Sequence, residues 1–373
     1  MGIEQRIAQA RAASPGIPVD CHALFANHTD AMTLYACARR DGFAVRVSPT
    51  PRAARSSCGV ALLVEASMRW RSRHWLSARA SSLKGWSRFR VRLTRIAIGT
   101  ASARGDEEGV KVIYFDNAGT NRLKPPEVAE TVTRAINSFG GVGRGAHEAA
   151  LDADLAVYRA RDQIARLFNG PGAKQVAFSA NVTEALNIVV SGLLHAGDHA
   201  VTTAASHNSV LRPLFRKQDE EGVELSILPV APDASIDYEQ FSSLFRDNTK
   251  LAVVTHASNL TGDVYDIARM ASIAHDHGAL LVVDSAQTAG SLPIDMQADR
   301  IDIVAFTGHK GLYGPQGTGG MCIAESVEVP PFKVGGSGTH SYDRKHPAFM
   351  PERLEAGTLN AHGLAGLLAE LAH

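Results

Sequence analysis

Residues 302–321 read DIVAFTGHKGLYGPQGTGGM, and this stretch decides which fold the chain can adopt. The apolar residues 303–306 are typical of a buried strand, which ends where the sequence turns to Thr-Gly-His-Lys at Lys310. A lysine just past such a strand in an α/β sheet faces the crevice in which these sheets bind ligands. Partial desolvation there lowers a lysine pKa and frees the amine for a Schiff base, whereas this stretch alone fits an ordinary loop lysine equally well. The glycines over residues 311–320 predict a turn after the strand.

A second apolar run, LLVVD at residues 280–284, ends in Asp284, and Gln287 follows three residues later. Lys310 lies 26 residues beyond Asp284, which is about one strand–helix–strand step of a parallel sheet. Pyridoxal phosphate requires such a pair, because a buried carboxylate keeps the pyridine nitrogen protonated while a lysine holds the aldehyde as an imine. The spacing therefore predicts a pyridoxal phosphate site between Asp284 and Lys310.

The C-terminal part of the chain alternates strand patterns with helix patterns. Strands are expected at residues 112–116, 175–179, 199–204, 224–230, 250–256, 280–284 and 301–306. Helices are expected at residues 125–139 and 152–168, from Thr183, near Val210, and at residues 267–277 and 364–371. Alternation of this kind predicts an α/β domain, with a mainly parallel sheet covered by helices on both faces.

Seven motifs in a fixed order indicate the family. They are YFDNAGT (114–120), GRGAHE (143–148), FSANVTEALN (178–187), ASHNSVLRP (205–213), VDSAQTAG (283–290), TGHKGLYGPQGTG (307–319) and RLEAGT (353–358). From Val112 onward the chain resembles the class V aminotransferases of fold type I, and most closely the cysteine desulfurase and selenocysteine lyase branch. The resemblance implies a fold type I large domain over residues 111–373. The resemblance also implies that relatives continue into a small C-terminal domain, which carries a persulfide-forming cysteine and a carboxylate-binding arginine. We therefore expect either a truncated or disrupted copy that stops at His373 or a separate chain that supplies the missing part.

The loop at residues 179–183 connects a predicted strand to a predicted helix. Backbone N–H groups at the helix start, including that of Val182, and the Thr183 hydroxyl would form an anion site for the cofactor phosphate. Thr183 also fits a plain N-cap, and one hydroxyl can serve both purposes.

The resemblance assigns further roles around Lys310, which it makes the catalytic lysine. It implies that Thr307 and His309 add donors to the phosphate and that Gln287 donates to the phenolic oxygen of the cofactor. His207 matches a catalytic residue that stacks on the pyridine ring and takes part in proton transfer. Asn259 matches a position that contacts cofactor or substrate, and Thr339 lies in a segment that reaches the phosphate of a neighbouring subunit, which implies a homodimer.

Residues 1–66 have the pattern of a small α+β domain. Strands are expected at residues 21–25, 43–47 and 60–64, with a helix from Asn27 to Gly42. Residues 48–59, SPTPRAARSSCG, resemble a family of small sulfur/selenium carrier-like domains. The nearby Arg52 and Arg55 would favour a reactive Cys58 thiolate, although cysteine is also among the residue types most often buried and inert.

Three functions fit these patterns. The first is a pyridoxal-phosphate-dependent cysteine desulfurase or selenocysteine lyase that passes its chalcogen to Cys58 or to an acceptor protein. The second is a truncated, non-catalytic carrier or scaffold, and the third is a class V aminotransferase or epimerase. Cys21, Cys37 and Cys322 lie in apolar patterns and are interpreted as structural.

The composition is that of a globular protein with 45% apolar residues, 20% charged residues and zero net charge. Between Arg69 and Arg104 there are ten Lys/Arg and no acidic residue. This basic segment fits nucleic-acid or membrane binding, but a solvated linker over residues 67–110, or a stretch translated out of frame, fits its irregular pattern better. We expect neither nucleic acid nor membrane as a partner. Four dispersed cysteines without zinc spacing predict no metal site and a cytoplasmic location.

Overall fold

The computed structural model describes residues 21–24, 45–49, 60–64, 114–143, 145–338 and 342–371. The chain divides into two compact units, Met1–Ile113 and Tyr114–His373. The first contains an antiparallel sheet in the order β1-β3-β2. Its strands are β1 (Cys21–Leu24), β2 (Val45–Pro49) and β3 (Val60–Val64).

Two of these strands confirm the predicted positions, and β2 begins two residues later than predicted. The helix predicted from Asn27, the thiol of Cys58 and the linker at residues 67–110 lie outside the described residues.

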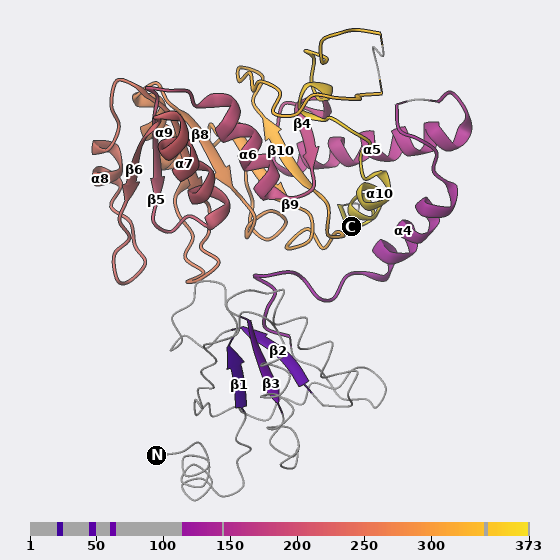
Figure 1. Cartoon of the computed structure of the whole chain (residues 1–373), viewed down its shortest axis with the longest axis horizontal. Helices are drawn as coiled ribbons and strands as arrows, with labels where there is room; N and C mark the ends of the chain where they lie inside the picture. Colours follow the sequence, from indigo (N-terminus) through magenta and orange to yellow (C-terminus); the bar gives the residue numbers. More distant parts are fainter. Residues whose placement is uncertain are drawn as a thin grey trace, which may run out of the picture. The chain divides into compact units, whose positions relative to one another are not determined.

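The second unit is built on a seven-stranded sheet in the order β4-β10-β9-β8-β7-β5-β6 (Figure 1). The strands are β4 (Val176–Ser179), β5 (His199–Thr203), β6 (Glu224–Leu228), β7 (Thr249–Thr255), β8 (Leu280–Asp284), β9 (Ile303–Thr307) and β10 (Gly319–Ile323). The pairs from β6 through β9 are parallel, and β10 is antiparallel to both β4 and β9. The predicted mainly parallel sheet is therefore confirmed.

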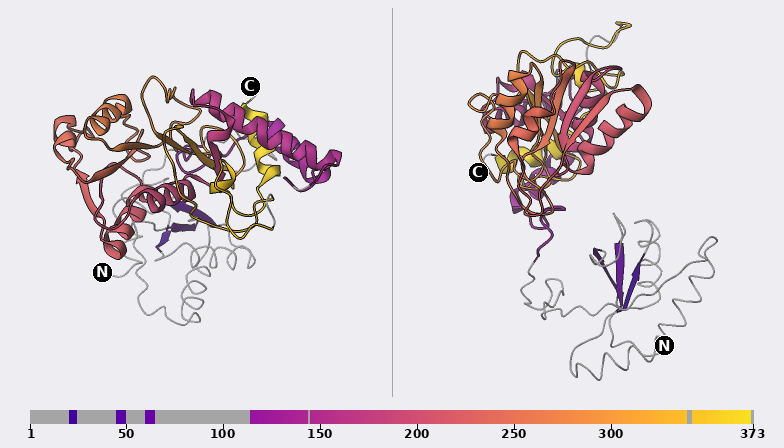
Figure 2. Two further views of the ribbon diagram at one scale, coloured as in Figure 1. Left: turned by 90° about the horizontal axis from the view of Figure 1, so that it is seen from above. Right: turned by 90° about the vertical axis from the view of Figure 1, so that its left-hand side faces the viewer.

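Helices cover both faces of this sheet (Figure 2). They are α4 (Pro126–Ser138), α5 (Glu148–Leu167), α6 (Val182–Leu193), α7 (Asn208–Glu221), α8 (Tyr238–Ser243), α9 (Ile267–Asp276) and α10 (Ala361–Leu371), with short 3-10 turns at Ala173–Gln175 and Glu352–Leu354. One core cluster joins residues of α5, α9 and α10 to the sheet, and a second joins residues of α6 and α7 to the opposite face.

Alternate residues of the central strands enter these two clusters. Val283 and Phe306 belong to the first, while Val282 and Ala305 belong to the second. A strand buried on both faces gains from an apolar residue at every position, which is why the sequence shows continuous apolar runs there.

Three predictions about local structure are wrong. Residues 114–116 form no strand, because the Tyr114 hydroxyl donates to the carbonyl oxygens of Asp116 (3.2 Å) and Thr120 (3.0 Å) and closes a turn instead. The turn predicted over residues 311–320 is shorter, since Gly319 and Gly320 begin β10. Helix α5 begins at Glu148, four residues before its predicted start.

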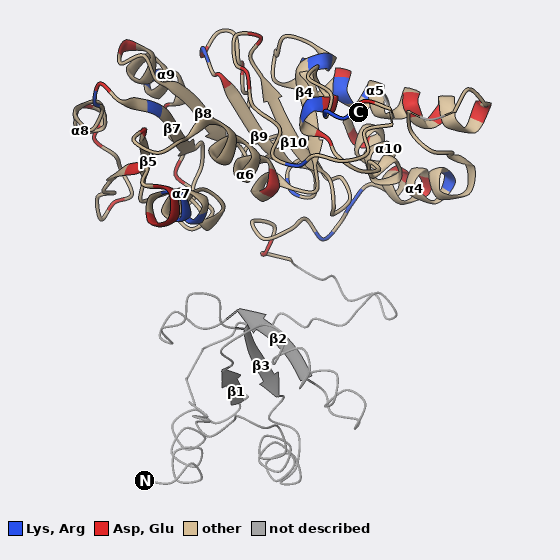
Figure 3. Cartoon of the chain, turned by 45° about the horizontal axis from the view of Figure 1, so that its top comes forward, with Lys and Arg blue, Asp and Glu red and all other residues tan. Residues whose placement is uncertain are grey.

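Basic and acidic residues both occur along the outer helices of the second unit (Figure 3). Among the residues that the structure describes, no helix is both long and apolar enough to cross a membrane.

Candidate cofactor site

A cavity of about 510 Å³ lies where β7, β8 and β9 end and helices α6 and α7 begin. Nine of the predicted site residues line it: Val182, Thr183, His207, Asn259, Asp284, Gln287, Thr307, His309 and Lys310. Residues as far apart as Val182 and Lys310, 128 positions along the chain, thus meet in one place because parallel strands deliver their carboxyl ends to one edge of the sheet. Cys58 and Thr339 are not among the described residues.

Asp284 and Lys310 face this cavity from neighbouring strands. Asp284 ends β8, is 2% exposed, and accepts a hydrogen bond from the Ala286 backbone N–H at 3.0 Å. Burial raises the pKa of its carboxyl group, against the opposing effects of that hydrogen bond and of the positive charge on Lys310. Burial also lowers the pKa of Lys310, and the Asp284 carboxylate partly offsets this. The lysine is therefore biased toward the neutral amine that a Schiff base needs.

A tight turn after β9 sets the position of Lys310. The Gly308 N–H donates to the Thr318 carbonyl at 2.8 Å, and the Tyr313 N–H donates to the Lys310 carbonyl at 2.9 Å. A Cβ atom added at Gly308 would lie 2.1 Å from Thr318 Oγ1, so only glycine fits there.

His207 is the N-cap residue of α7. Its Nδ1 accepts a hydrogen bond from the Ser209 N–H at 3.1 Å and lies 2.8 Å from the Ser209 hydroxyl oxygen. Because Nδ1 acts as an acceptor, the proton of the neutral ring sits on Nε2. Burial lowers the pKa of His207, Asp284 opposes this effect, and Lys310 and Arg212 add to it.

Ser209 was missed at the sequence level although it also lines the cavity. Its hydroxyl oxygen lies 3.4 Å from Asp284 Oδ2 and 2.8 Å from His207 Nδ1, so these two acceptors share its single proton. The signal was available in the ASHNSVLRP motif, where a serine two residues after the histidine falls in the first turn of a helix.

The anion loop precedes α6. Asn181 is the N-cap, since its side-chain oxygen accepts from the Glu184 N–H at 3.0 Å while Glu184 Oε2 accepts from the Ala180 N–H at 2.7 Å. The N-cap interpretation of Thr183, which the sequence also allowed, is therefore wrong. Asn181 satisfies the N–H group of Glu184 instead, which leaves Thr183 in the first turn with its side chain on the cavity wall.

Thr307 gives a direct test of whether a phosphate fits. Its hydroxyl oxygen is buried and lacks a hydrogen-bond partner in the described part of the chain, and the residue lines the cavity opposite α6. Buried polar atoms are nearly always hydrogen-bonded, so an orphaned hydroxyl beside a helix N-terminus indicates a site that an anion completes. The residues present therefore fit the phosphate of pyridoxal phosphate.

The segment at residues 116–121 forms another wall that the sequence interpretation used only as a motif. Gln287 Nε2 donates to the Ala118 carbonyl at 3.0 Å, and His309 Nδ1 lies 3.0 Å from Thr120 Oγ1. The Asn121 side chain donates to the Lys310 carbonyl at 3.2 Å. Burial lowers the pKa of His309, with Lys310 and Lys124 adding to the effect.

The position of Cys322 agrees with its interpretation as a structural cysteine. It lies in β10, is fully buried, and burial raises its pKa to about 12. A buried thiol that stays protonated is a poor nucleophile.

Both parts of the chain match known protein families. The model of the family "Aminotransferase class-V" matches residues 113–373, and that of "Putative Se/S carrier protein-like" matches residues 20–80. A cysteine desulfurase of Salmonella newport is 32% identical over 273 residues, covering 70% of this chain and 67% of the relative.

Solved structures agree with these matches. The apo cysteine desulfurase of Thermococcus onnurineus NA1 has a TM-score of 0.65 and 32% identity, over 70% of this chain and 66% of that one. A C-DES mutant with glycine covalently linked to its PLP cofactor has a TM-score of 0.62 and 26% identity, over 69% of this chain and 70% of that one. The chain thus spans about two thirds of the length of the first relatives it matches. With a sheet, a lysine and a buried aspartate arranged as described, the chain belongs to the class V aminotransferase family of pyridoxal-phosphate-dependent enzymes.

Proposed function

We propose that this protein is a pyridoxal-phosphate-dependent cysteine desulfurase or selenocysteine lyase that releases sulfur or selenium from the amino acid and passes it to a carrier cysteine. The observation that carries the proposal is the meeting of Lys310, Asp284 and His207 in one cavity, in a chain 32% identical to a cysteine desulfurase. The cofactor, when bound, supplies an electron-withdrawing ring that stabilises negative charge at the substrate α-carbon. The residues of the chain supply binding and proton transfer.

Binding divides among three groups of residues. Thr307 Oγ1, the Thr183 hydroxyl and the first N–H groups of α6, starting at Val182, hold the phosphate. The Asp284 carboxylate holds the proton on the pyridine nitrogen, and the positive charge it meets there offsets the burial that raises its pKa. Gln287 donates its side-chain N–H to the phenolic oxygen, while His309 and Asn259 close the remaining wall.

Proton transfer falls to Lys310 and His207. Lys310 would hold the cofactor aldehyde in the resting protein, and its free amine would take the proton from the substrate α-carbon once substrate is bound. Burial lowers the pKa of Lys310, which favours this neutral amine. His207 carries a proton at Nε2 and supplies it as the sulfur departs.

Sulfur leaves by attack of a thiolate on the substrate sulfur. The S–S bond of a persulfide forms, the Cβ–S bond of the substrate breaks, and Cβ takes a proton to give alanine. We assign the attacking thiolate to Cys58, in the Ser-Cys-Gly sequence of the carrier-like domain, since Cys322 is buried. In this proposal residues 1–66 are the carrier domain, residues 67–110 are a linker and residues 111–373 are the catalytic domain. The protein is a cytoplasmic homodimer in which Thr339 reaches the phosphate of the neighbouring subunit.

One experiment tests the reaction. The full chain loaded with pyridoxal phosphate is incubated with cysteine, and separately with selenocysteine. A thiol reductant releases the transferred sulfur or selenium as sulfide or selenide, which is quantified together with alanine, and one portion is kept without reductant for mass spectrometry. Equal amounts of alanine and chalcogen, absent in Lys310→Ala, are expected. Mass spectrometry should find the persulfide on Cys58, and Cys322→Ser should leave the yield unchanged.

The other reaction types have different products. Keto acid without sulfide would identify an aminotransferase, and racemised cysteine would identify an epimerase. Cofactor binding without any turnover would identify a carrier or scaffold. Each of these results would replace the desulfurase proposal.

A further inference from the structure

Among the strands that the structure describes, β4 lies at the edge of the seven-stranded sheet and pairs with β10 alone. The backbone groups on its open side need partners other than a strand. The Phe178 N–H donates to Glu355 Oε1 at 2.6 Å, and the Val176 carbonyl accepts from the guanidinium of Arg161 at 2.7 Å. Two side chains from distant parts of the chain thus take the place of an eighth strand.

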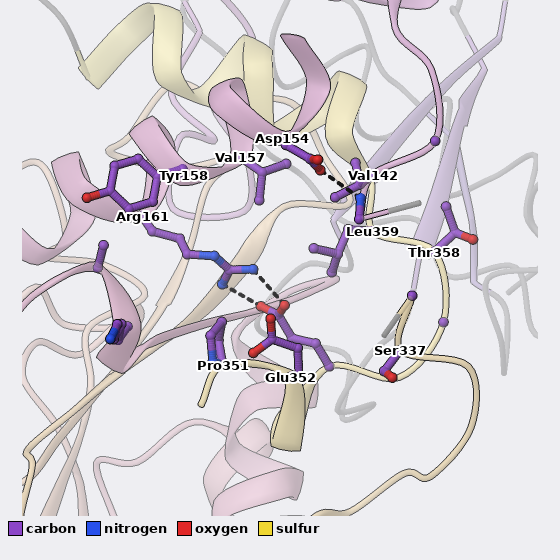
Figure 4. A pocket seen from close by; sticks show the side chains of 17 residues that line it. Val142, Asp154, Val157, Tyr158, Arg161, Ser337, Pro351, Glu352, Thr358 and Leu359 are labelled. Atoms are coloured by element: carbon purple, nitrogen blue, oxygen red, sulfur yellow. Dashed lines mark hydrogen bonds and ion pairs between the residues drawn. The ribbon is translucent and has the colours of Figure 1, made fainter. Parts of the chain in front are cut away.

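These two side chains form a buried ion pair. Arg161 extends from α5 toward the second cavity described below (Figure 4). Its guanidinium makes two parallel hydrogen bonds to the Glu355 carboxylate, both of 2.6 Å. The side chains are 8% and 4% exposed, and the Arg161 guanidinium also stacks over the Phe178 ring at 4.8 Å from its centroid. The pair borders a second cavity, of about 450 Å³, and neither residue lines the cofactor cavity.

The strand held by this pair leads directly into the anion loop. β4 ends at Ser179, whose hydroxyl donates to the Asn181 carbonyl at 2.8 Å, and α6 begins at Val182. On the other side of the loop, a Cβ atom at Gly319 would lie 2.7 Å from the Asn181 Cα, so there is no space for the loop to shift toward β10. The end of β4 therefore sets where the N–H groups of α6 point.

We propose that Arg161 and Glu355 are positioning residues for the cofactor phosphate. They act through β4, and the inference rests on the cofactor site proposed above. The pair is electrically neutral as a whole and lies outside the cofactor cavity, so its influence is geometric. Removing it frees the Val176 carbonyl and the Phe178 N–H, and the end of β4 can then move relative to Thr307 on β9.

The phosphate and the aldehyde of the cofactor would be held by different parts of the chain. The phosphate depends on the loop after β4, whereas the aldehyde depends on Lys310 after β9, which the pair does not touch. Pyridoxal lacks the phosphate but still condenses with a lysine amine. Loss of the pair should therefore weaken the binding of pyridoxal phosphate and leave the binding of pyridoxal unchanged.

The variant that tests this replaces both residues, Arg161→Met with Glu355→Met, in the full chain. A single replacement would leave an unpaired buried charge and destabilise the fold, whereas an apolar pair of similar volume is often neutral or stabilising. We expect the affinity for pyridoxal phosphate to fall about tenfold, as for the loss of about one hydrogen bond between the displaced loop and the phosphate, and the affinity for pyridoxal to stay within about twofold of the parent. Both are measured by titration of the imine absorbance.

A matched control is available on the same helix. Arg166 and Asp162 form an exposed ion pair at 2.8 Å, with side chains 72% and 33% exposed, so Arg166→Met with Asp162→Met should change neither affinity. Denaturant unfolding of each variant establishes that the folded state is retained. A conservative Arg161→Lys variant keeps the charge but loses the bidentate contact with Glu355. Its affinity for pyridoxal phosphate should lie between those of the parent and the double variant.

Two results would overturn the inference. One is an unchanged affinity of the double variant for pyridoxal phosphate. The other is an equal loss of affinity for both compounds, which would mean that the pair supports the fold in general. If the parent chain itself binds neither compound, the cofactor site proposed above is wrong, and this result is recognised before any variant is compared.

Discussion

The hydroxyl oxygen of Ser209 lies 3.4 Å from Oδ2 of Asp284, the most deeply buried acid of the cofactor cavity. Through the same hydroxyl, the Asp284 carboxylate is connected to the imidazole of His207, 2.8 Å away. A single small side chain thus joins the group that holds the pyridine proton to the group assigned to proton transfer. This hydroxyl donates to the ionised carboxylate and so lowers the pKa of Asp284.

Ser209→Ala should slow turnover by about tenfold, in the range expected for one hydrogen bond to a charged group. Without the hydroxyl, the pKa of Asp284 rises further and the carboxylate holds the pyridine proton less firmly. The measurement is kcat against pH, together with the pH dependence of the cofactor absorbance. Ser209→Thr, which keeps a hydroxyl, should retain most of the activity, and equal losses in both variants would contradict this role.

Asp284→Asn should stabilise the cofactor-free protein while abolishing most of its activity. The buried Asp284 carboxylate is costly in the apo form, because the positive charge of Lys310 offsets its burial only in part, as the raised pKa indicates. A neutral amide removes that cost. We expect a gain of about 1 kcal/mol in the free energy of unfolding of the apo form and a turnover reduced about a hundredfold or more. Denaturant unfolding of apo protein and a turnover assay give the two values. A less stable apo variant would show that Asp284 has a structural role.

Arg212→Gln should raise the pKa of His207, because the positive charge of Arg212 is one of the causes that lower it. A histidine whose folded pKa lies below its unfolded value contributes stability above the unfolded pKa, and this contribution is lost as pH falls through the folded value. The variant narrows the gap between the two values, so its stability should fall less between neutral and mildly acidic pH. NMR titration of the His207 ring and unfolding at several pH values test both statements.

A control for Arg212→Gln is needed because α7 carries a second arginine. Arg216, one helical turn further along α7, is paired with Glu220 at 2.9 Å and is not among the charges that act on His207. Arg216→Gln should therefore leave the titration of His207 unchanged. A shift of equal size in both variants would indicate a general effect of net charge.

Gly320→Ala should destabilise the protein by about 1–3 kcal/mol or more, because the added Cβ would lie 2.3 Å from the Ala177 carbonyl oxygen of β4. The closest atom belongs to the backbone, so no side chain can move aside. Gly141→Ala is the matched control, since nothing lies within 4 Å of its Cβ position. Denaturant midpoints that are equal for the two variants would mean that β4 and β10 do not pack as described.

The sequence predicted the parts of this fold that depend on local patterns. β8 and β9 were recognisable because both faces of each strand are buried, and the spacing from Asp284 to Lys310 follows from one crossover of a parallel sheet. β10 could not be recognised, since its two leading glycines resemble a turn. They are strand residues because β4 and Phe306 approach too closely for a side chain.

Other parts of the site depend on tertiary contacts alone. Arg161 and Glu355 are separated by 194 positions, and nothing in their local sequence marks them as partners. Ser209 is an ordinary residue of a first helical turn until β8 places Asp284 beside it. Orphaned atoms such as the Thr307 hydroxyl become visible only when the positions of all neighbouring atoms are known.

The dependence of β4 on late parts of the chain also has a consequence for protein synthesis. Its neighbouring strand begins at Gly319, and the carboxylate on its open side belongs to Glu355, so neither partner exists when residues 176–179 leave the ribosome. The lysine for the cofactor aldehyde, Lys310, is translated before both. A growing chain should therefore be unable to retain pyridoxal phosphate until residue 355 has emerged, and cofactor capture should be among the last steps in the maturation of this protein.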